Sequence, residues 1–117
     1  MSPLHEIVET PACLAAAARA GMTEDDRAAV AAFIAADPQA GDLIKGSGGV
    51  RKVRVAKPGG GKSGGWRVLT AYVSDTVAVL VVTVSGKNQR GNNSKAEINE
   101  MAKLMKALKA EARRKED

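Results

Sequence analysis

The sequence has few of the residues that most enzymes use for acid–base or metal chemistry. Its 117 residues include one histidine, His5, and one cysteine, Cys13, and aromatic residues make up only 3%. A single cysteine cannot form an internal disulfide, and such low usage is typical of a reducing cytoplasm. A metal site needs clustered ligands, and a serine triad needs a histidine positioned by its neighbours. We therefore expect no metal, no cofactor and no triad.

Long apolar segments are also missing. The longest apolar run, 77–84, is far too short to span a bilayer, and the first residues lack the basic start and long apolar core of a signal peptide. These absences predict a cytoplasmic protein with no membrane contact. A chain of this length makes one domain, 1–117, that can bury a core without disulfides.

Acidic residues are almost absent from the middle of the chain. Residues 1–44 carry two basic and seven acidic side chains, whereas 45–90 carry nine basic and one acidic, Asp75. Residues 91–117 carry seven basic and five acidic side chains, which completes the net charge of +5. A local excess of positive charge favours a surface that binds a polyanion such as RNA, although a solvated surface without a partner would show the same pattern.

Hydrophobic periodicity and capping signals divide the chain into helices and strands. Thr10 and Thr23 have the sequence context of N-caps, and Ser94 with Glu97 forms a capping box. We expect strands over 4–9, 50–57, 66–73 and 77–85, and helices over 10–20, 24–36 and 95–114. The strand over 77–85 is apolar on both faces, which predicts a central strand covered on both sides.

This order of elements predicts an α+β fold. Short connections favour a small antiparallel sheet, built from a three-strand meander with the N-terminal strand at its edge. Two N-terminal helices and one C-terminal helix are expected on one face of that sheet. The other face would then carry the basic side chains of Lys52 and Arg54.

The hairpin over 46–67 carries the strongest functional signal, with eight glycines, six basic residues and no acid. Lys52 and Arg54 share one face of its first strand, and Arg67 lies on the second strand. Alternation in the second strand puts Trp66 and Tyr72 on the face opposite Arg67. Its turn imitates two nucleotide-binding loops, but a strand follows where both motifs need a helix, so we reject them.

Cations alone can promote the cleavage of RNA. The 2′-hydroxyl can attack the adjacent phosphate, arginine can stabilise the phosphorane charge through a bidentate contact, and lysine can transfer a proton. Lys52, Arg54, Arg67 and Lys87 could therefore form a ribonuclease site without histidine. Charge alone supports nucleic-acid binding and leaves catalysis undecided.

Two motifs add a family resemblance to this physical argument. The runs GSGGVRKVR at 46–54 and GKSGGWRV at 61–68, followed by VAVLVVTVSGKN, resemble the RelE/HigB-type toxins of the RelE/ParE superfamily of bacterial toxin–antitoxin modules. The resemblance implies a compact α+β fold and ribosome-dependent cleavage of messenger RNA, which inhibits translation. It also implies a cognate antitoxin, of the helix-turn-helix DNA-binding kind.

The resemblance also assigns residues. The catalytic set would be Lys52, Arg54, Arg67 and Lys87. Residues that contact RNA would be Arg51, Lys57, Lys62, Trp66, Tyr72, Asn88 and Arg90. Asn88 stands where many relatives carry arginine, and 89–94 lack the tyrosine of well-studied relatives, so Trp66 or Tyr72 would supply base stacking.

Two other functions stay open from the sequence. A ParE-like toxin inhibits DNA gyrase without cutting RNA, although that branch generally lacks the basic strand pair. A basic module that binds RNA or the ribosome without cleaving would show the same charge distribution.

Overall fold

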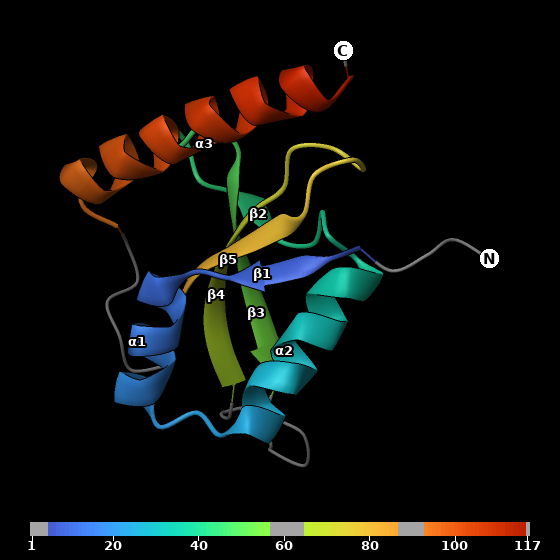
Figure 1. Ribbon diagram of the computed structural model, residues 1–117. Helices are drawn as coiled ribbons and strands as arrows, with labels where there is room; N and C mark the ends of the chain where they lie inside the picture. The colour runs from blue at the N-terminus through green and yellow to red at the C-terminus, as the bar shows by residue number, and fades with distance from the viewer. Residues whose placement is uncertain (1–4, 57–64, 87–92, 117) are drawn as a thin grey trace.

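The computed structural model describes residues 5–56, 65–86 and 93–116 (Figure 1). Its elements, in chain order, are β1 Ile7–Glu9, α1 Pro11–Ala20, α2 Glu24–Ala36, β2 Asp42–Leu43, β3 Val50–Ala56, β4 Gly65–Ala71, β5 Val79–Gly86 and α3 Lys95–Glu116. The α+β class, the three helices and the four expected strands are confirmed. The short strand β2 was not predicted. No helix in the described ranges is long and apolar enough to cross a membrane.

The first two helices begin at the predicted caps. The Thr10 hydroxyl accepts a hydrogen bond from the Cys13 N–H at 3.0 Å. Thr23 and Asp26 form a reciprocal capping box, with N···O distances of 3.0 and 2.9 Å. Helix α1 ends at Gly21, whose φ of 77° is the left-handed conformation that favours glycine. Local chemistry therefore fixes these helix boundaries by pairing backbone groups that the helices leave open.

The sheet is mixed, which corrects the antiparallel prediction. Its strand order is β1-β5-β4-β3-β2, and β1 runs parallel to β5, with Ile7 opposite Val79. All other neighbouring strands are antiparallel. A parallel pair needs a long connection, and α1 and α2 begin the long excursion between β1 and β5. The predicted edge position of β1 is confirmed, but β4 rather than β5 occupies the middle.

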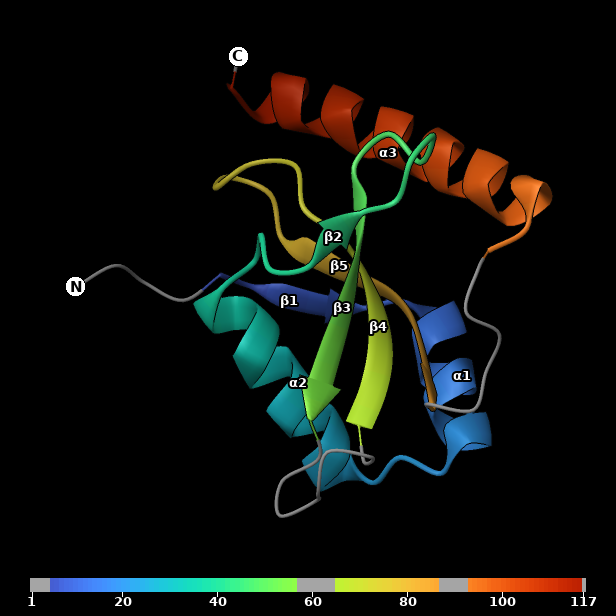
Figure 2. The same cartoon turned by 180° about the vertical axis from the view of Figure 1, so that it is seen from behind.

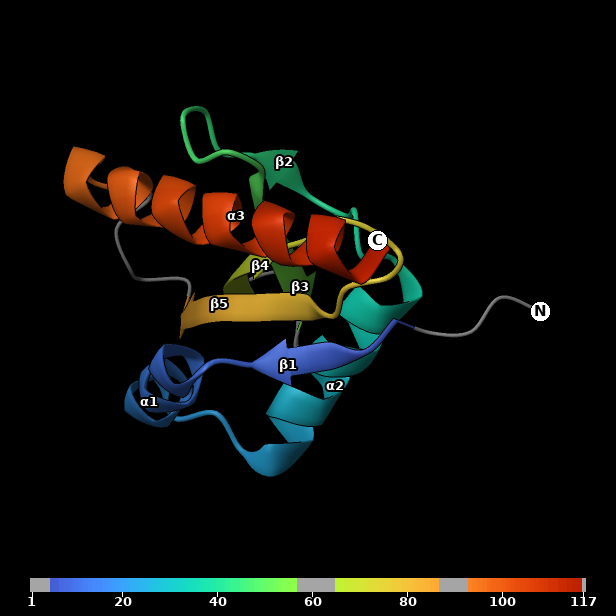
Figure 3. The same cartoon turned by 45° about the horizontal axis from the view of Figure 1, so that its top comes forward.

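Two hydrophobic clusters lie on opposite faces of this sheet. On the face that α1 and α2 cover, which we call the helix-pair face, the cluster includes Cys13, Ala16, Ala17, Val30, Ile34, Val53, Val55, Trp66, Val68, Val79, Val81 and Val84. On the opposite face, the α3 face, Met101 and Met105 pack against Val50, Leu69 and Ala71. The expectation that all three helices cover one face of the sheet was therefore wrong, because α3 crosses the other face at one end of the sheet (Figures 2 and 3).

Strand β5 confirms one part of its prediction. Val79 and Val81 are buried in the helix-pair cluster, while Leu80 and Val82 pack against the α3 cluster. Both faces of the strand are thus covered, as its continuous apolar sequence indicated. The α3 cluster reaches only part of β3 and β4, so the strand ends beyond it can present polar side chains.

A tight turn holds β2 against β3. The buried Ser47 hydroxyl donates to the Ile44 carbonyl at 2.6 Å and accepts from the Val50 N–H at 3.0 Å. Gly41 has a φ of 95°, and a Cβ there would lie 2.4 Å from the Lys52 carbonyl oxygen. Only glycine allows this close approach. The result is a cross-strand pair in which Asp42 lies opposite Lys52.

Candidate functional site

Three of the predicted basic residues come together on the α3 face. Arg54 lies directly opposite Arg67 in the β3–β4 register, and Lys52 precedes Arg54 by two residues on the same face. In an antiparallel pair, opposite residues point to the same side, with Cβ atoms about 5 Å apart. The expected grouping of Lys52, Arg54 and Arg67 on one face, which we call the basic cluster, is therefore present. The chemical roles of these residues stay a prediction.

Among the described residues, carboxylates do not balance all the cations of this cluster. In the part of the chain that the structure describes, neither Lys52 nor Arg54 forms an ion pair with a carboxylate. Like charges directly opposite each other on a sheet are destabilising, as Arg54 and Arg67 are here. An anionic ligand would relieve this repulsion, so the cluster suits a phosphate-containing partner.

The other predicted basic and polar residues cannot be placed. Lys57, Lys62, Lys87, Asn88 and Arg90 all lie outside the described residues. The assignment of Lys87 to catalysis, and of the other four to RNA contact, stays a prediction.

The expectation that Trp66 stacks on a base is corrected by its burial. Its side chain is 5% exposed and packs in the helix-pair cluster, on the face opposite Arg67. No base could reach the ring without separating the sheet from α1 and α2. Trp66 is therefore a core residue, and the alternation along β4 had already separated it from Arg67.

Tyr72 and Arg51 also lie away from the basic cluster. The Tyr72 hydroxyl donates to the Asp75 carboxylate at 2.8 Å, His5 Nε2 lies 3.0 Å from the same oxygen, and the His5 and Tyr72 rings meet edge to face. The bond from Tyr72, and then that from His5, hold the pKa of Asp75 below its usual range. The bond to Asp75 raises the pKa of Tyr72, and the Arg51 charge acts in the opposite direction.

This arrangement places both residues apart from the basic cluster, and their expected contacts with RNA stay predictions. Tyr72 packs against the helix-pair cluster, and Arg51 lies on that side too, with Thr70 and Leu43 as cross-strand partners. Since Lys52 and Arg54 project from the opposite face, a nucleotide held there would not touch Tyr72 or Arg51. Any contact that either residue makes with RNA would therefore involve another part of the strand.

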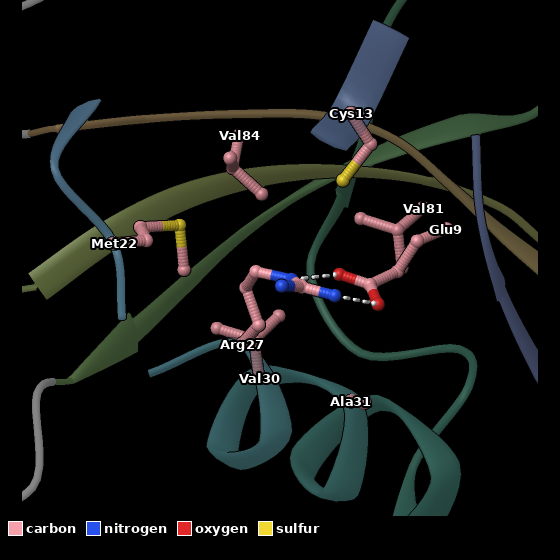
Figure 4. A pocket seen from close by; sticks show the side chains of 8 residues that line it. All are labelled: Glu9, Cys13, Met22, Arg27, Val30, Ala31, Val81 and Val84. Atoms are coloured by element: carbon pink, nitrogen blue, oxygen red, sulfur yellow. Dashed lines mark hydrogen bonds and ion pairs between the residues drawn. The ribbon is translucent and has the colours of Figure 1, made fainter. Parts of the chain in front are cut away.

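A second polar cluster joins β1 to α2 (Figure 4). Arg27 donates two hydrogen bonds to the Glu9 carboxylate, at 2.9 and 3.1 Å, and these bonds raise the pKa of Arg27. Burial, and secondly the Glu9 charge, raise the pKa of the adjacent Cys13 thiol to about 11. The cavity between them measures about 10 Å³, too small for more than a water molecule. The cluster therefore fastens the fold and offers no ligand site.

An open groove of about 400 Å³ runs beside the basic cluster. It lies between β2, β3 and the start of α3, and its lining includes Lys52, Lys45 and Asp42. Sequence reasoning missed it because a two-residue strand shows no periodicity. Within the residues that can be described, no three His, Cys, Asp or Glu side chains come close enough to hold a metal.

Comparison with known families gives one match that covers most of the chain. A family model described as the RelE toxin of the RelE/RelB toxin–antitoxin system matches residues 15–116. The match runs from within α1 to the end of α3 and includes Lys52, Arg54 and Arg67. The chain therefore belongs to the RelE family, the toxin component of a toxin–antitoxin system.

Proposed function

We propose that this toxin is an endoribonuclease that cuts messenger RNA on the ribosome and so inhibits translation in the bacterial cytoplasm. The observation that supports the proposal most directly is the grouping of Lys52, Arg54 and Arg67 on the α3 face. Three cations on adjacent strands, two of them with no carboxylate partner in the described residues, can hold the phosphate at which RNA is cut.

The proposed reaction uses the RNA, these side chains and water, and Lys87 stays a further predicted catalytic residue. The 2′-oxygen attacks phosphorus and the bond to the 5′-oxygen breaks, which leaves a 2′,3′-cyclic phosphate and a 5′-hydroxyl. Arg54 and Arg67 lie side by side on the same face, and both would contact the phosphorane oxygens. Lys52 would protonate the leaving 5′-oxygen, because arginine keeps its proton in proteins, and the proton of the 2′-hydroxyl would pass to water.

The antitoxin would act on the same face. We propose a helix-turn-helix DNA-binding protein that places an acidic segment over the basic cluster. Such a segment would relieve the repulsion between Arg54 and Arg67 and block access of RNA. Messenger RNA and antitoxin would thus compete for one surface.

Induction of the chain in a bacterium, followed by mapping of transcript 5′ ends, tests the proposed activity. We expect cuts in phase with codons, which disappear in Lys52→Ala and Arg67→Ala variants. Lys109→Ala, which removes an exposed cation from α3, should still cut and is the matched control.

Growth arrest with intact transcripts would refute the proposed nuclease. A supercoiling assay on the purified chain would then decide between the alternatives, because inhibition of gyrase would identify a ParE-like activity. Salt-dependent RNA binding without cut products would instead identify a non-catalytic module.

A further inference from the structure

The groove beside the basic cluster combines charge and apolar surface in a way that the cluster itself does not. The described residues that line it are Asp42, Leu43, Ile44, Lys45, Lys52, Asn93 and Ile98. Its volume of about 400 Å³ lies in the range typical of small-ligand sites. Lys52 belongs both to this groove and to the basic cluster, so the two surfaces are continuous.

The β2–β3 register places an acidic and a basic side chain next to each other in the groove. Asp42 lies opposite Lys52, so the two side chains point to the same face of the sheet. Asp42 is nevertheless in no ion pair with Lys52 in the described structure. A carboxylate repels phosphate but accepts hydrogen bonds from hydroxyl groups, whereas lysine attracts phosphate. A nucleotide suits both, because it carries a phosphate and a hydroxyl close together.

Rigid backbone holds this wall of the groove in place. The Ser47 hydroxyl ties the Ile44 carbonyl to the Val50 N–H, and Gly41 brings the chain against the Lys52 carbonyl. Ile98, from the first turns of α3, lies close to Gly46 and closes the opposite side. Ile44 and Ile98 supply apolar surface on which a flat ring can pack.

We propose that this groove is a nucleotide subsite that holds one unit of single-stranded RNA next to the nucleotide engaged by the basic cluster. The base packs on Ile44 and Ile98, the phosphate lies near Lys45 and Lys52, and the Asp42 carboxylate accepts a hydrogen bond from the ribose 2′-hydroxyl. The 2′-hydroxyl is the group that distinguishes RNA from DNA. The inference rests on the proposed function, because it assigns the groove to the same RNA.

Fluorescence anisotropy with a labelled RNA hexanucleotide and the DNA of the same sequence tests this subsite on the full-length chain. We expect the wild-type chain to bind RNA about fivefold more tightly than DNA, and Asp42→Ala to bring this ratio close to one. Lys45→Ala should weaken binding of both RNA and DNA. It should also lower the slope of log affinity against log salt concentration by about 0.7, the value for one phosphate contact to a single strand. Gel analysis after each titration confirms that the RNA is intact.

Two matched variants separate the subsite from general electrostatics. Asp25→Ala removes an exposed carboxylate from the start of α2, and Lys109→Ala removes an exposed cation from α3; neither should change the RNA-to-DNA ratio. Asp42 and Lys45 are themselves exposed, so circular dichroism should show their variants folded.

The sign of the Asp42→Ala effect decides the outcome. If Asp42 merely repels phosphate, its removal strengthens RNA and DNA binding by the same factor, and the subsite is refuted. A wild-type chain that binds RNA and DNA equally, or binds neither, refutes it too. The proposed function fails separately, if transcripts stay intact in cells. If Asp42→Ala and Lys45→Ala bind RNA as the wild type does, while Arg54→Ala binds it less tightly, only the subsite is refuted.

Discussion

The two faces of the sheet are built from the same strands and differ in how their charges are balanced. On the helix-pair side, two pairs of polar groups are joined by hydrogen bonds: Arg27 donates two to Glu9, and Tyr72 donates one to Asp75. On the α3 face, two arginines lie opposite each other and no described carboxylate reaches Arg54. The helix-pair face thus contributes mainly to stability, and the α3 face carries in Arg54 a cation that an anionic ligand can stabilise.

The largest expected effect separates activity from stability on the α3 face. Arg54→Ala should lower RNA cleavage about 100-fold, as the loss of one positioned charge-stabilising donor does in other enzymes. Its free energy of unfolding should change by no more than about 0.5 kcal/mol, and should rise rather than fall, because a like-charge pair is removed. Primer extension on a cut transcript and urea unfolding measure the two quantities. A clear loss of stability would contradict the division between the faces.

The next effect belongs to the helix-pair face. Ile34 is 1% exposed, and Ile34→Ala should lower the free energy of unfolding by about 3 kcal/mol through lost burial and a cavity. Its neighbour Phe33 is 43% exposed, so Phe33→Ala should cost about 1 kcal/mol or less although it removes more atoms. Urea unfolding compares them directly, and equal losses would mean that α2 is oriented differently.

A smaller effect depends on pH. Burial raises the pKa of Cys13 from 9.0 to about 11, so above pH 9 the unfolded chain releases a proton that the folded chain keeps. The free energy of unfolding should therefore fall between pH 9 and about 11, by about 1 to 2 kcal/mol more in the wild type than in Cys13→Ala. Unfolding curves at pH 8 and 10.5 give the difference. Identical pH dependence in both proteins would show that the thiol is not buried.

The smallest expected effect concerns the surface cluster around Asp75. Tyr72→Phe removes the hydrogen bond that contributes most to its low pKa, and His5→Ala removes the next. Both variants should raise the pKa of Asp75, Tyr72→Phe more than His5→Ala, as measured by carbon-13 NMR titration of the carboxyl group. RNA cleavage should be unchanged in both, since neither residue lies on the α3 face. Lost cleavage in Tyr72→Phe would instead give its hydroxyl group a role in the reaction.

Local patterns predicted the parts of the fold that local chemistry controls. Thr10, Thr23 and Gly21 set helix ends with groups a few residues away, so their roles were readable. Alternation likewise placed Lys52 and Arg54 on one face, and Arg67 followed from the pairing of adjacent strands. The direction of β1 was wrong because it depends on the path of the chain through α1 and α2, which no local pattern records.

The errors at the site have similar causes. Trp66 was expected to stack on RNA from its chemical type, although the position of its side chain in β4 already opposed Arg67. The groove wall at Asp42 and Lys45 depends on a turn centred on Ser47 and on the distant start of α3. Contacts between segments so far apart in the chain are set by tertiary packing, which the sequence does not show directly.

The parallel pairing of β1 with β5 has a consequence for synthesis of the chain. Ile7 is translated before its partner Val79, which emerges from the ribosome only after α1, α2, β2, β3 and β4 have been made. The β3–β4 pair, which carries the cations, joins segments that are closer in sequence and is complete before β5 is made. Strand β1 therefore has no neighbour in the sheet until β5 has been translated. A product truncated before Val79 would leave β1 unpaired.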